Sequence, residues 1–459
     1  MACSGNMLGL LGVWKSTGLV SSLVFPSCLK AGKGFCPSLA QAFPATVKFR
    51  RRFCASLAEV KPAASTMASA QKKVLVPIGF GVEEMEVVIL VDVLRRAGSD
   101  VTVASVETDL QIEASRRVKL VADMLISNCT EEMFDLVVLP GGMPGSSRLR
   151  DCEILQSITK KQAADGRLYG AVCAAPAVVL ETWGLLKGLR ATCHPSFISQ
   201  LSSSLTVGSR VQRDGIVTTS RGPGTTMEFA LSFVEQLYGK EKAEEVAKPM
   251  VMRTKDNSEL VKQEFNRVEW SFSTTPRILV PIANGSEEME AVIIIDVLRR
   301  ANADVVVASV EETLEIVASR KVKIVADKLI EDASSSAYDL IVLPGGMPGA
   351  ERLSKTESLI QLLKEQAESK RAYGAICASP AVVLEIHGLL KEKKATAHPA
   401  FTQKIADQSA VGTRVVIDGN LITSRGPGTT MEFALAIVDK IFGQEKATGI
   451  AEAMVFPYP

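Results

Sequence analysis

The sequence predicts an α/β protein made of two tandem domains, each a doubly wound and mostly parallel sheet. Three observations predict this fold. Of the 459 residues, 47% are hydrophobic and only 5% are aromatic, which is typical of aliphatic strands that helices bury on both faces. Short apolar runs alternate with helical patterns, as they do where a chain crosses over between parallel strands. Finally, the whole pattern occurs twice.

The two copies match without a gap. The segment VLVPIGFGVEEMEVVILVDVLRRAG begins at Val74 and returns 204 residues later as ILVPIANGSEEMEAVIIIDVLRRAN, which begins at Ile278. The same spacing relates Cys173 to Cys377. One copy therefore serves as a control for the other, because a reactive residue that the unit needs should occur in both. The reactive residues that lack such a counterpart are Cys129, Cys152, Cys193 and His387.

This register predicts domain 1 over residues 72–252 and domain 2 over residues 277–457, each long enough to bury a sizeable core. The intervening residues 253–276 are polar and lack a clear period, so we expect a linker. Its Trp270 and Phe272 indicate that part of the linker packs against a domain.

Residues 1–57 differ in composition from the rest of the chain. They hold seven Lys or Arg residues and no Asp or Glu, which is typical of an organelle transit peptide. Their apolar stretch is interrupted by Lys15 and precedes most of the basic residues. This disfavours a membrane span and makes a secretory signal the weaker alternative. Without the segment the net charge would change from +1 to −6, so no general attraction to nucleic acid is expected.

The predicted elements of domain 1 follow the order of a doubly wound sheet, in which functional groups gather beyond the carboxyl ends of the strands. A helix is expected to begin at Glu83-Glu84, because acidic residues suit the positive end of a helix. The predicted strands are residues 74–78, 101–105, 136–139, 169–173 and 216–219, and further helices cover residues 177–186 and 227–237.

Cys173 stands between a predicted strand and a predicted helix, and Cys377 repeats the arrangement. A residue at such a sharp strand-to-helix turn is a nucleophile elbow. Nearby helix-end N–H groups favour a thiolate, so we expect a lowered thiol pKa and a reactive sulfur. The alternative is a small buried hydrophobic residue, and the repetition favours the nucleophile.

Glu86 and Glu290 each precede an apolar run, so their carboxyl groups are expected to face the interior. Burial raises the pKa of a carboxyl group, which would let it stay protonated, donate a hydrogen bond to the thiolate and shuttle protons. The neighbouring acidic residues are instead expected to be solvated in the first turn of the helix. These are Glu83, Glu84, Glu287 and Glu288.

His194 and His398 each precede a proline in a predicted loop. Such a histidine polarises the thiol or handles a proton, or else it only holds the backbone, and the sequence leaves both roles open.

The glycine turn Pro140-Gly141-Gly142 ends a predicted strand and exposes backbone amides. The N–H groups of Gly142 and Ala174 are candidates for an oxyanion hole, and an ordinary turn is the alternative. The corresponding pair in domain 2 is Gly346 and Ala378.

No cofactor is predicted. The five cysteines beyond residue 57 show neither a zinc-ligand spacing nor a disulfide framework. None of the glycine turns has the spacing of a Walker loop or of a dinucleotide-binding GxGxxG motif.

Several strings occur in the same order in both copies: Gly-x-Glu-Glu-Met-Glu, Val-Leu-Pro-Gly-Gly, Cys-Ala-x-Pro, His-Pro and Ser-Arg-Gly-Pro-Gly-Thr. With these strings, residues 74–251 and 278–455 closely resemble the DJ-1/PfpI family, and specifically its Parkinson-disease-protein branch. The resemblance implies two flavodoxin-like domains, each with a nucleophile elbow like that of class I glutamine amidotransferases. The tandem form with a presequence looks like plant homologues, which implies a chloroplast location, with the mitochondrion as the alternative.

The resemblance also implies roles for individual residues. It places the nucleophile on Cys173 and Cys377, the protonated partner on Glu86 and Glu290, and the oxyanion-hole amides on the four residues named above. The residue two positions after the nucleophile, often Gly in the family, is Ala175 in one copy and Ser379 in the other. The remaining residues at the family's pocket are the histidines His194 and His398, and the binding or structural arginines Arg116, Arg320, Arg221 and Arg425.

The activity implied is that of a glutathione-independent glyoxalase acting on methylglyoxal or glyoxal, with protein or nucleotide deglycation as a further activity. The partners are small aldehydes, without nucleic acid or membrane, and the repeats are expected to form an intramolecular pseudo-dimer that further association can extend. The alternative is a redox-sensing chaperone that uses the same oxidisable cysteine. A glutamine amidotransferase or cysteine protease ranks last, because neither histidine is followed by the acidic residue of a triad.

Overall fold

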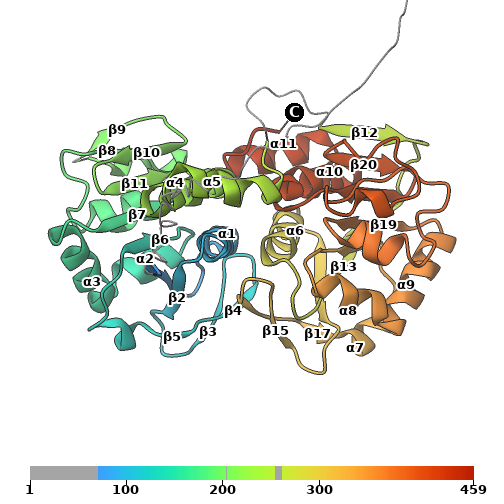
Figure 1. The fold of residues 1–459 in the computed structure, drawn as a ribbon, viewed down its shortest axis with the longest axis horizontal. Coiled ribbons are helices and arrows are strands. Elements are labelled where there is room, and N and C mark those ends of the chain that lie inside the picture. The colour runs from blue at the N-terminus through green and yellow to red at the C-terminus, as the bar shows by residue number, and fades with distance from the viewer. Residues whose placement is uncertain (1–70, 203, 254–260, 459) are drawn as a thin grey trace, which may run out of the picture. The chain divides into compact units, whose positions relative to one another are not determined.

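The computed structural model describes residues 71–202, 204–253 and 261–458. The predicted transit peptide, residues 1–57, lies outside the described residues. The two repeats belong to one structural unit, and each has the predicted α/β architecture (Figure 1).

The first repeat contains a seven-stranded sheet, and all five predicted strands take part in it. Neighbouring strands are parallel except for the pair at one edge, β10 and β11, which is antiparallel. In spatial order the strands are β10 (Val211–Asp214), β11 (Val217–Ser220), β7 (Leu168–Val172), β6 (Leu136–Leu139), β1 (Lys73–Ile78), β2 (Asp100–Ser105) and β5 (Met124–Leu125).

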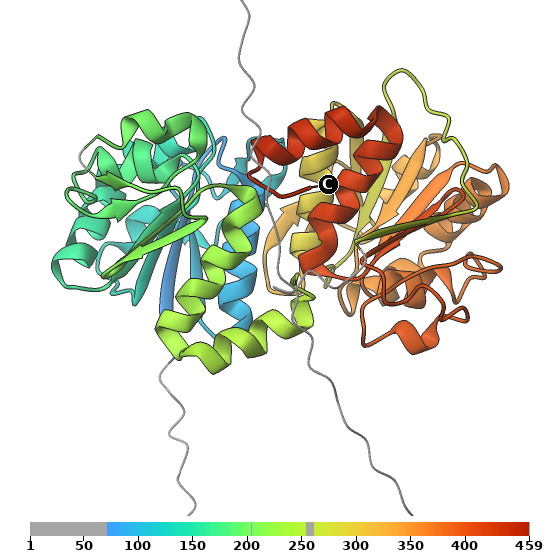
Figure 2. The ribbon, with the colours of Figure 1, turned by 90° about the horizontal axis from the view of Figure 1, so that it is seen from above.

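Helices cover both faces of this sheet. Helices α1 and α4 pack side by side on one face, and α2 and α3 lie on the other (Figure 2). Most of α1 is buried, because it lies between its own sheet and the second repeat. The helices are α1 (Glu84–Arg96), α2 (Gly145–Arg150), α3 (Glu153–Ala164), α4 (Thr226–Tyr238) and α5 (Lys240–Ala247). Within the described residues, no helix is both long and apolar enough to cross a membrane.

One predicted helix is shorter than expected. Instead of residues 177–186, the structure has the π-helix η2 (Pro176–Glu181). Gly184 follows with a φ of +77°, and the amide of Leu185 donates to the carbonyl of Leu180 at 2.9 Å. A glycine in this conformation ends a helix because it turns the chain back over the last carbonyl groups.

The second repeat builds an eight-stranded sheet in the same order, with one extra strand at its edge. That strand, β12 (Lys262–Phe265), comes from the predicted linker and pairs in parallel with β20. Trp270 Nε1 donates to the carbonyl of Gly419 at 2.8 Å, so this part of the linker packs against domain 2, as its aromatic residues indicated. The other strands are, in spatial order, β20 (Val415–Asp418), β21 (Leu421–Ser424), β19 (Ala372–Ile376), β18 (Leu340–Leu343), β13 (Arg277–Ile282), β14 (Asp304–Ser309) and β17 (Lys328–Leu329). The helices of this repeat are α6 (Glu288–Arg300), α7 (Ile330–Ser334), α8 (Gly349–Lys355), α9 (Glu357–Glu368), α10 (Thr430–Phe442) and α11 (Gln444–Ala453).

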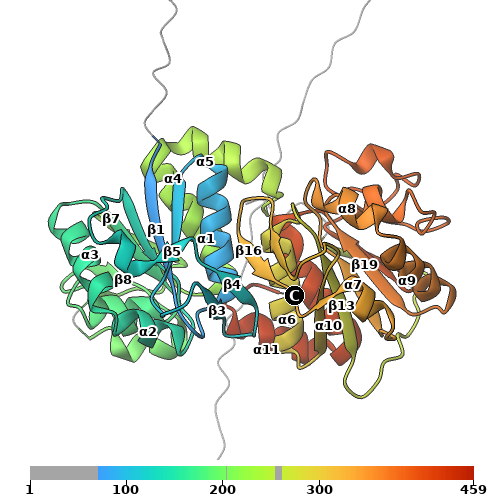
Figure 3. The same cartoon turned by 90° about the horizontal axis from the view of Figure 1, so that it is seen from below.

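The two repeats contact each other through helices and strands. Helix α1 packs against α6, and Ile324 of one repeat lies opposite Leu120 of the other where β16 pairs with β4 (Figure 3). A small four-stranded sheet therefore spans both repeats, with the order β15 (Glu315–Val317), β16 (Lys323–Val325), β4 (Lys119–Val121) and β3 (Gln111–Glu113). This arrangement fits the expected pseudo-dimer.

Candidate active site

Cys173 lies directly beyond β7 in a constrained backbone conformation. Its φ is +64°, and that of Cys377 is +65°, values that side chains other than glycine rarely adopt. The Cys173 amide donates to the Ser220 carbonyl at 3.1 Å, and the Cys173 carbonyl accepts from the His194 amide at 2.8 Å. Both bonds recur with the same lengths at Cys377. The backbone thus fixes each sulfur at the end of a strand, the geometry of a nucleophile elbow.

The carboxyl group of Glu86 lies beside this elbow and is completely buried. Its Oε2 accepts from the amide of Gly141 at 2.7 Å, and the carboxyl group and the Cys173 thiol act on each other's pKa. Among the described residues, the buried Oε1 has no hydrogen-bond partner. The same is true of Glu290, with Gly345 at 2.8 Å and with Cys377.

The pKa values of Cys173 and Glu86 differ from the sequence-based expectation in one respect. Burial raises the pKa of Glu86 well above its ordinary value and that of Glu290 to about 7. The thiol pKa of Cys173 is also raised, by burial and then by the charges of Glu86 and Glu83, although the Gly142 amide opposes them. The expected lowering of the thiol pKa is therefore wrong, because burial raises it first and the two carboxylates raise it further. Since each charge disfavours the other, the pair of Cys173 and Glu86 keeps a proton at neutral pH.

The glycine loop that follows β6 touches the elbow. A Cβ atom on Gly141 would lie 2.6 Å from Cβ of Cys173 and 3.0 Å from the amide nitrogen of Ala174, so only glycine fits this approach. Gly142 has a φ of +88°, and its amide acts to lower the thiol pKa of Cys173. The amides of Gly142 and Gly346 thus act on the two sulfurs, and the amides of Ala174 and Ala378 lie next to the glycine loops.

Both ring nitrogens of His194 are hydrogen-bonded to the backbone. Nδ1 accepts from the Ser196 amide at 3.2 Å, so the proton of the neutral ring is on Nε2, which lies 3.0 Å from the carbonyl oxygen of Ala453. His398 Nε2 lies 2.8 Å from the carbonyl oxygen of Pro249. In the described residues no bond joins either ring to a nucleophilic sulfur, so this geometry favours the backbone-holding role. Because Ala453 and Pro249 belong to the opposite repeat, each site is bordered by both halves of the chain.

The four acidic residues expected in solvent are buried, which corrects that prediction. Glu83 Oε2 accepts from Arg300 of the second repeat at 2.7 Å, and Glu287 Oε1 accepts from Arg96 of the first at 2.8 Å. The first turn of each helix therefore faces the partner helix and not water. The other two carboxylates, those of Glu84 and Glu288, accept from the backbone amides of Arg116 and Arg320 respectively. The sequence analysis did not identify Arg96 and Arg300 as functional residues, although the presence of this arginine in both copies could have indicated a role.

Among the described residues, two groups of carboxylates lie close enough together to hold a metal ion. They are Glu83 with Glu84 and Asp296, and Asp92 with Glu287 and Glu288. Each group already binds a guanidinium, from Arg300 or Arg96, which supplies the compensating positive charge.

Two of the four predicted arginines lie at the contact between the repeats. The carbonyl of Arg116 accepts from Arg299 at 2.8 Å, and that of Arg320 accepts from Arg95 at 2.8 Å. The side chain of Arg116 lines a cavity of about 790 Å³ that residues of α6, α10 and α11 complete. These arginines therefore lie beside the first turns of α1 and α6.

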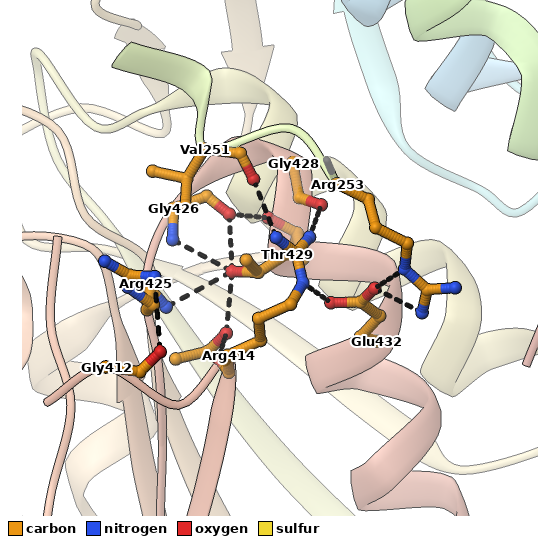
Figure 4. Close-up of polar contacts among 11 residues, drawn as sticks. Val251, Arg253, Gly412, Arg414, Arg425, Gly426, Gly428, Thr429 and Glu432 are labelled. Atoms are coloured by element: carbon orange, nitrogen blue, oxygen red, sulfur yellow. Dashed lines mark hydrogen bonds and ion pairs between the residues drawn. The ribbon is translucent and has the colours of Figure 1, made fainter. Parts of the chain in front are cut away.

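Arg425 belongs to a polar cluster next to the second site (Figure 4). Its side chain donates to the carbonyl of Gly412 at 3.4 Å. Beside it, Arg414 and Glu432 form a buried ion pair at 2.6 Å, and Arg253 bonds the same carboxylate at 2.7 Å. In the first repeat the corresponding pair, Arg210 with Glu228, is partly exposed, and Arg221 is half-buried. The surroundings of the two sites are thus similar but not identical.

Comparisons with known proteins agree with this geometry. A model described as the DJ-1/PfpI family matches residues 72–236 and 276–440. The protein named DJ-1 homolog B of Arabidopsis thaliana is 58% identical over 391 residues, which are 85% of this chain and 89% of that protein. A Caenorhabditis elegans protein named glutathione-independent glyoxalase DJR-1.2 is 35% identical over 175 residues, 37% of this chain and 90% of that protein. The solved structure of oxidized Toxoplasma gondii DJ-1 is 45% identical with a TM-score of 0.39, and covers 40% of this chain and 100% of that chain.

Proposed function

Because the chain belongs to the DJ-1/PfpI family, we propose that it is a glutathione-independent glyoxalase that converts methylglyoxal to lactate and glyoxal to glycolate. The observation that carries the proposal is the contact, in each repeat, between a cysteine at an elbow and a completely buried glutamate. The relative from Caenorhabditis elegans that is named a glyoxalase supports the reaction class.

The reaction begins when the Cys173 sulfur adds to the aldehyde carbon and forms a C–S bond. The carbonyl oxygen becomes an oxyanion, which the amides of Gly142 and Ala174 are placed to stabilise before it takes a proton. The product of this step is a hemithioacetal. Because Cys173 is only 9% exposed, little water competes with the protein amides for the developing charge.

The second step moves a proton between adjacent carbons. Glu86 removes the hydrogen of the former aldehyde carbon as a proton, which gives an enediol, and returns a proton to the neighbouring carbon, which gives a thioester. Water then cleaves the C–S bond and releases lactate and the thiol. No electron leaves the substrate, since one carbon is oxidised while its neighbour is reduced. A buried carboxyl group with a raised pKa suits this task, because it both accepts and donates the proton.

Lactate formation from methylglyoxal without glutathione tests the proposal. We expect the Cys173→Ser and Cys377→Ser variants each to keep part of the activity and the double variant to lose it. Cys152→Ser is the matched control, because Cys152 has no counterpart in the second repeat. If the unchanged protein makes no lactate above buffer, the glyoxalase proposal fails for this substrate and the redox-sensing chaperone replaces it.

We further propose a chloroplast location, supported by the basic, acid-free composition of residues 1–57. A fluorescent protein carrying residues 1–70 at its N-terminus would enter chloroplasts, and its accumulation in mitochondria would overturn this location.

A further inference from the structure

The two sites differ at one buried position next to the nucleophile. In the second site the completely buried Ser379 donates from its hydroxyl group to the carbonyl oxygen of Pro344 at 2.5 Å. In the first site this position is Ala175, which is also completely buried and has no hydroxyl group. The elbow and the glycine loop are therefore joined by a hydrogen bond in the second site that the first site cannot make.

This bond acts on the peptide group that holds the glutamate. The carbonyl of Pro344 and the amide of Gly345 belong to the same peptide group, and that amide donates to Glu290 Oε2 at 2.8 Å. A chain of hydrogen bonds thus runs from Ser379 through the peptide to the carboxyl group. Hydrogen bonds in such a chain polarise one another, so the amide becomes a better donor. A better donor favours the ionised carboxylate.

We propose that Ser379 is a positioning residue that makes Glu290 give up its proton more readily than Glu86, so that Cys173 is the more reactive thiol at neutral pH. The reason is the shared proton of each pair. An ionised Glu290 keeps the neighbouring Cys377 in the thiol form, whereas a protonated Glu86 supports a thiolate at Cys173. If the protein has the proposed function, the first site should turn over aldehyde faster than the second near neutral pH. This consequence rests on the proposed function.

The two glutamates lie among the same residue types, but the charges of these residues differ. Each faces its cysteine on the elbow, a glutamate on its own helix, and an arginine and an aspartate on the helix of the other repeat. Around Glu290 these are Cys377, Glu287, Arg96 and Asp92. Around Glu86 they are Cys173, Glu83 and Arg300, while Asp296 acts on Glu83. Burial opposes the ionisation of Glu83, yet Arg300 and Asp296 lower its pKa overall, so its charge raises the pKa of Glu86. In the second repeat, burial raises the pKa of Glu287 well above its ordinary value. One further difference is that Glu287 accepts from the amide of Glu290 at 2.7 Å, a bond that Glu83 does not make.

Burial raises the pKa of Glu290 only to about 7, whereas it raises that of Glu86 well above its ordinary value. This difference has the direction that the hydrogen-bond chain predicts, but after burial the charge of Glu83 also raises the pKa of Glu86. Because the charge of Glu83 and the bond between Glu287 and Glu290 also distinguish the two sites, exchanging the residues at positions 175 and 379 is needed to isolate the hydroxyl group.

The test measures how fast iodoacetamide labels each cysteine in the full chain from pH 6 to 9, with the labelled peptides quantified by mass spectrometry. We expect faster labelling of Cys173 near pH 7. Ser379→Ala should speed the labelling of Cys377 by about threefold to tenfold, the effect of one hydrogen bond, and shift its pH profile toward that of Cys173. Ala175→Ser should slow Cys173 by a similar factor. Since each variant carries the residue of the other repeat, both are compatible with the fold.

In each variant the cysteine of the unaltered site is the internal control and should keep its rate. Labelling rates and pH profiles that stay the same in both variants would overturn the inference, as would slower labelling of Cys377 in Ser379→Ala. Because labelling needs no aldehyde, a protein that makes no lactate but shows these shifts would contradict the proposed function and still support the role of Ser379.

Discussion

His194 Nε2 lies 3.0 Å from the carbonyl oxygen of Ala453, although 259 residues separate them in the sequence. The segment after Ala453 continues over the first site, where the amide of Gly224 donates to the carbonyl of Met454 at 2.7 Å. In the second site the residues after Pro249 take this place, and Val251 accepts from Arg414 at 3.1 Å. Each site is therefore covered by a segment of the opposite repeat.

Displacing one of these two segments should change only the site that it contacts. In the Gly224→Ala variant the new Cβ would lie 2.7 Å from Cα of Phe456, so the C-terminal segment must move and the Cys173 site should open. We expect iodoacetamide to label Cys173 several-fold faster while the rate at Cys377 stays the same. In the Gly428→Ala variant the new Cβ would lie 2.7 Å from the Val251 carbonyl oxygen. This variant should speed the labelling of Cys377 and leave the rate at Cys173 unchanged.

The control is Gly208→Ala, because nothing lies within 4 Å of the added atom. If Gly224→Ala speeds the labelling of both cysteines equally, the two segments do not each act on one site.

The ion pair between Arg300 and Glu83 should contribute strongly to stability. Replacing Arg300 by Gln leaves buried carboxylates without their cation, and breaking such a pair costs about 3–5 kcal/mol of the free energy of unfolding. Urea unfolding measures this loss. Arg352→Gln removes an ion pair with Glu311 whose arginine is 49% exposed, and should change the free energy by about 1 kcal/mol or less. Similar losses in both variants would contradict a buried contact between the repeats.

Stability should fall as the pH rises from about 4.5 to about 7. Burial raises the pKa of Glu288, and of Glu84, from the ordinary 4.5 to about 7, so the folded protein binds these protons more tightly than the unfolded chain. Their contribution is fully present below the unfolded pKa and is lost as the pH approaches the folded one. Unfolding in urea at several pH values should show this slope, and Glu288→Gln should reduce it by up to about 1.4 kcal/mol per pH unit. A slope that the substitution leaves unchanged would argue against titration of Glu288.

The fold and the nucleophile could be predicted because they depend on local patterns that occur twice. The alternation of strands and helices predicted the sheets, and the turn after residue 172 predicted an elbow at Cys173, where the backbone has the expected sharp turn. The burial of Glu86 followed from the apolar run after it.

What could not be predicted depends on contacts between distant segments. No local pattern shows that the first turn of α1 faces α6, so Glu83 was expected in solvent. The bond from His194 to Ala453 joins opposite repeats, and no spacing in the sequence indicates it. The raised thiol pKa of Cys173 results from burial beside two carboxylates, whereas sequence reasoning considered only the helix-end amides.

The central claim is that Glu86 and Glu290 relay the proton after the cysteine has bound the aldehyde, and the Glu86→Gln, Glu290→Gln double variant tests it most directly. Glutamine retains an oxygen that can accept from the amides of Gly141 and Gly345, but it cannot carry the proton. We predict that lactate formation from methylglyoxal falls by at least about 100-fold, while intact-mass measurements still detect the aldehyde adduct on Cys173 and Cys377. Lactate formation at the rate of the unchanged protein would contradict the account.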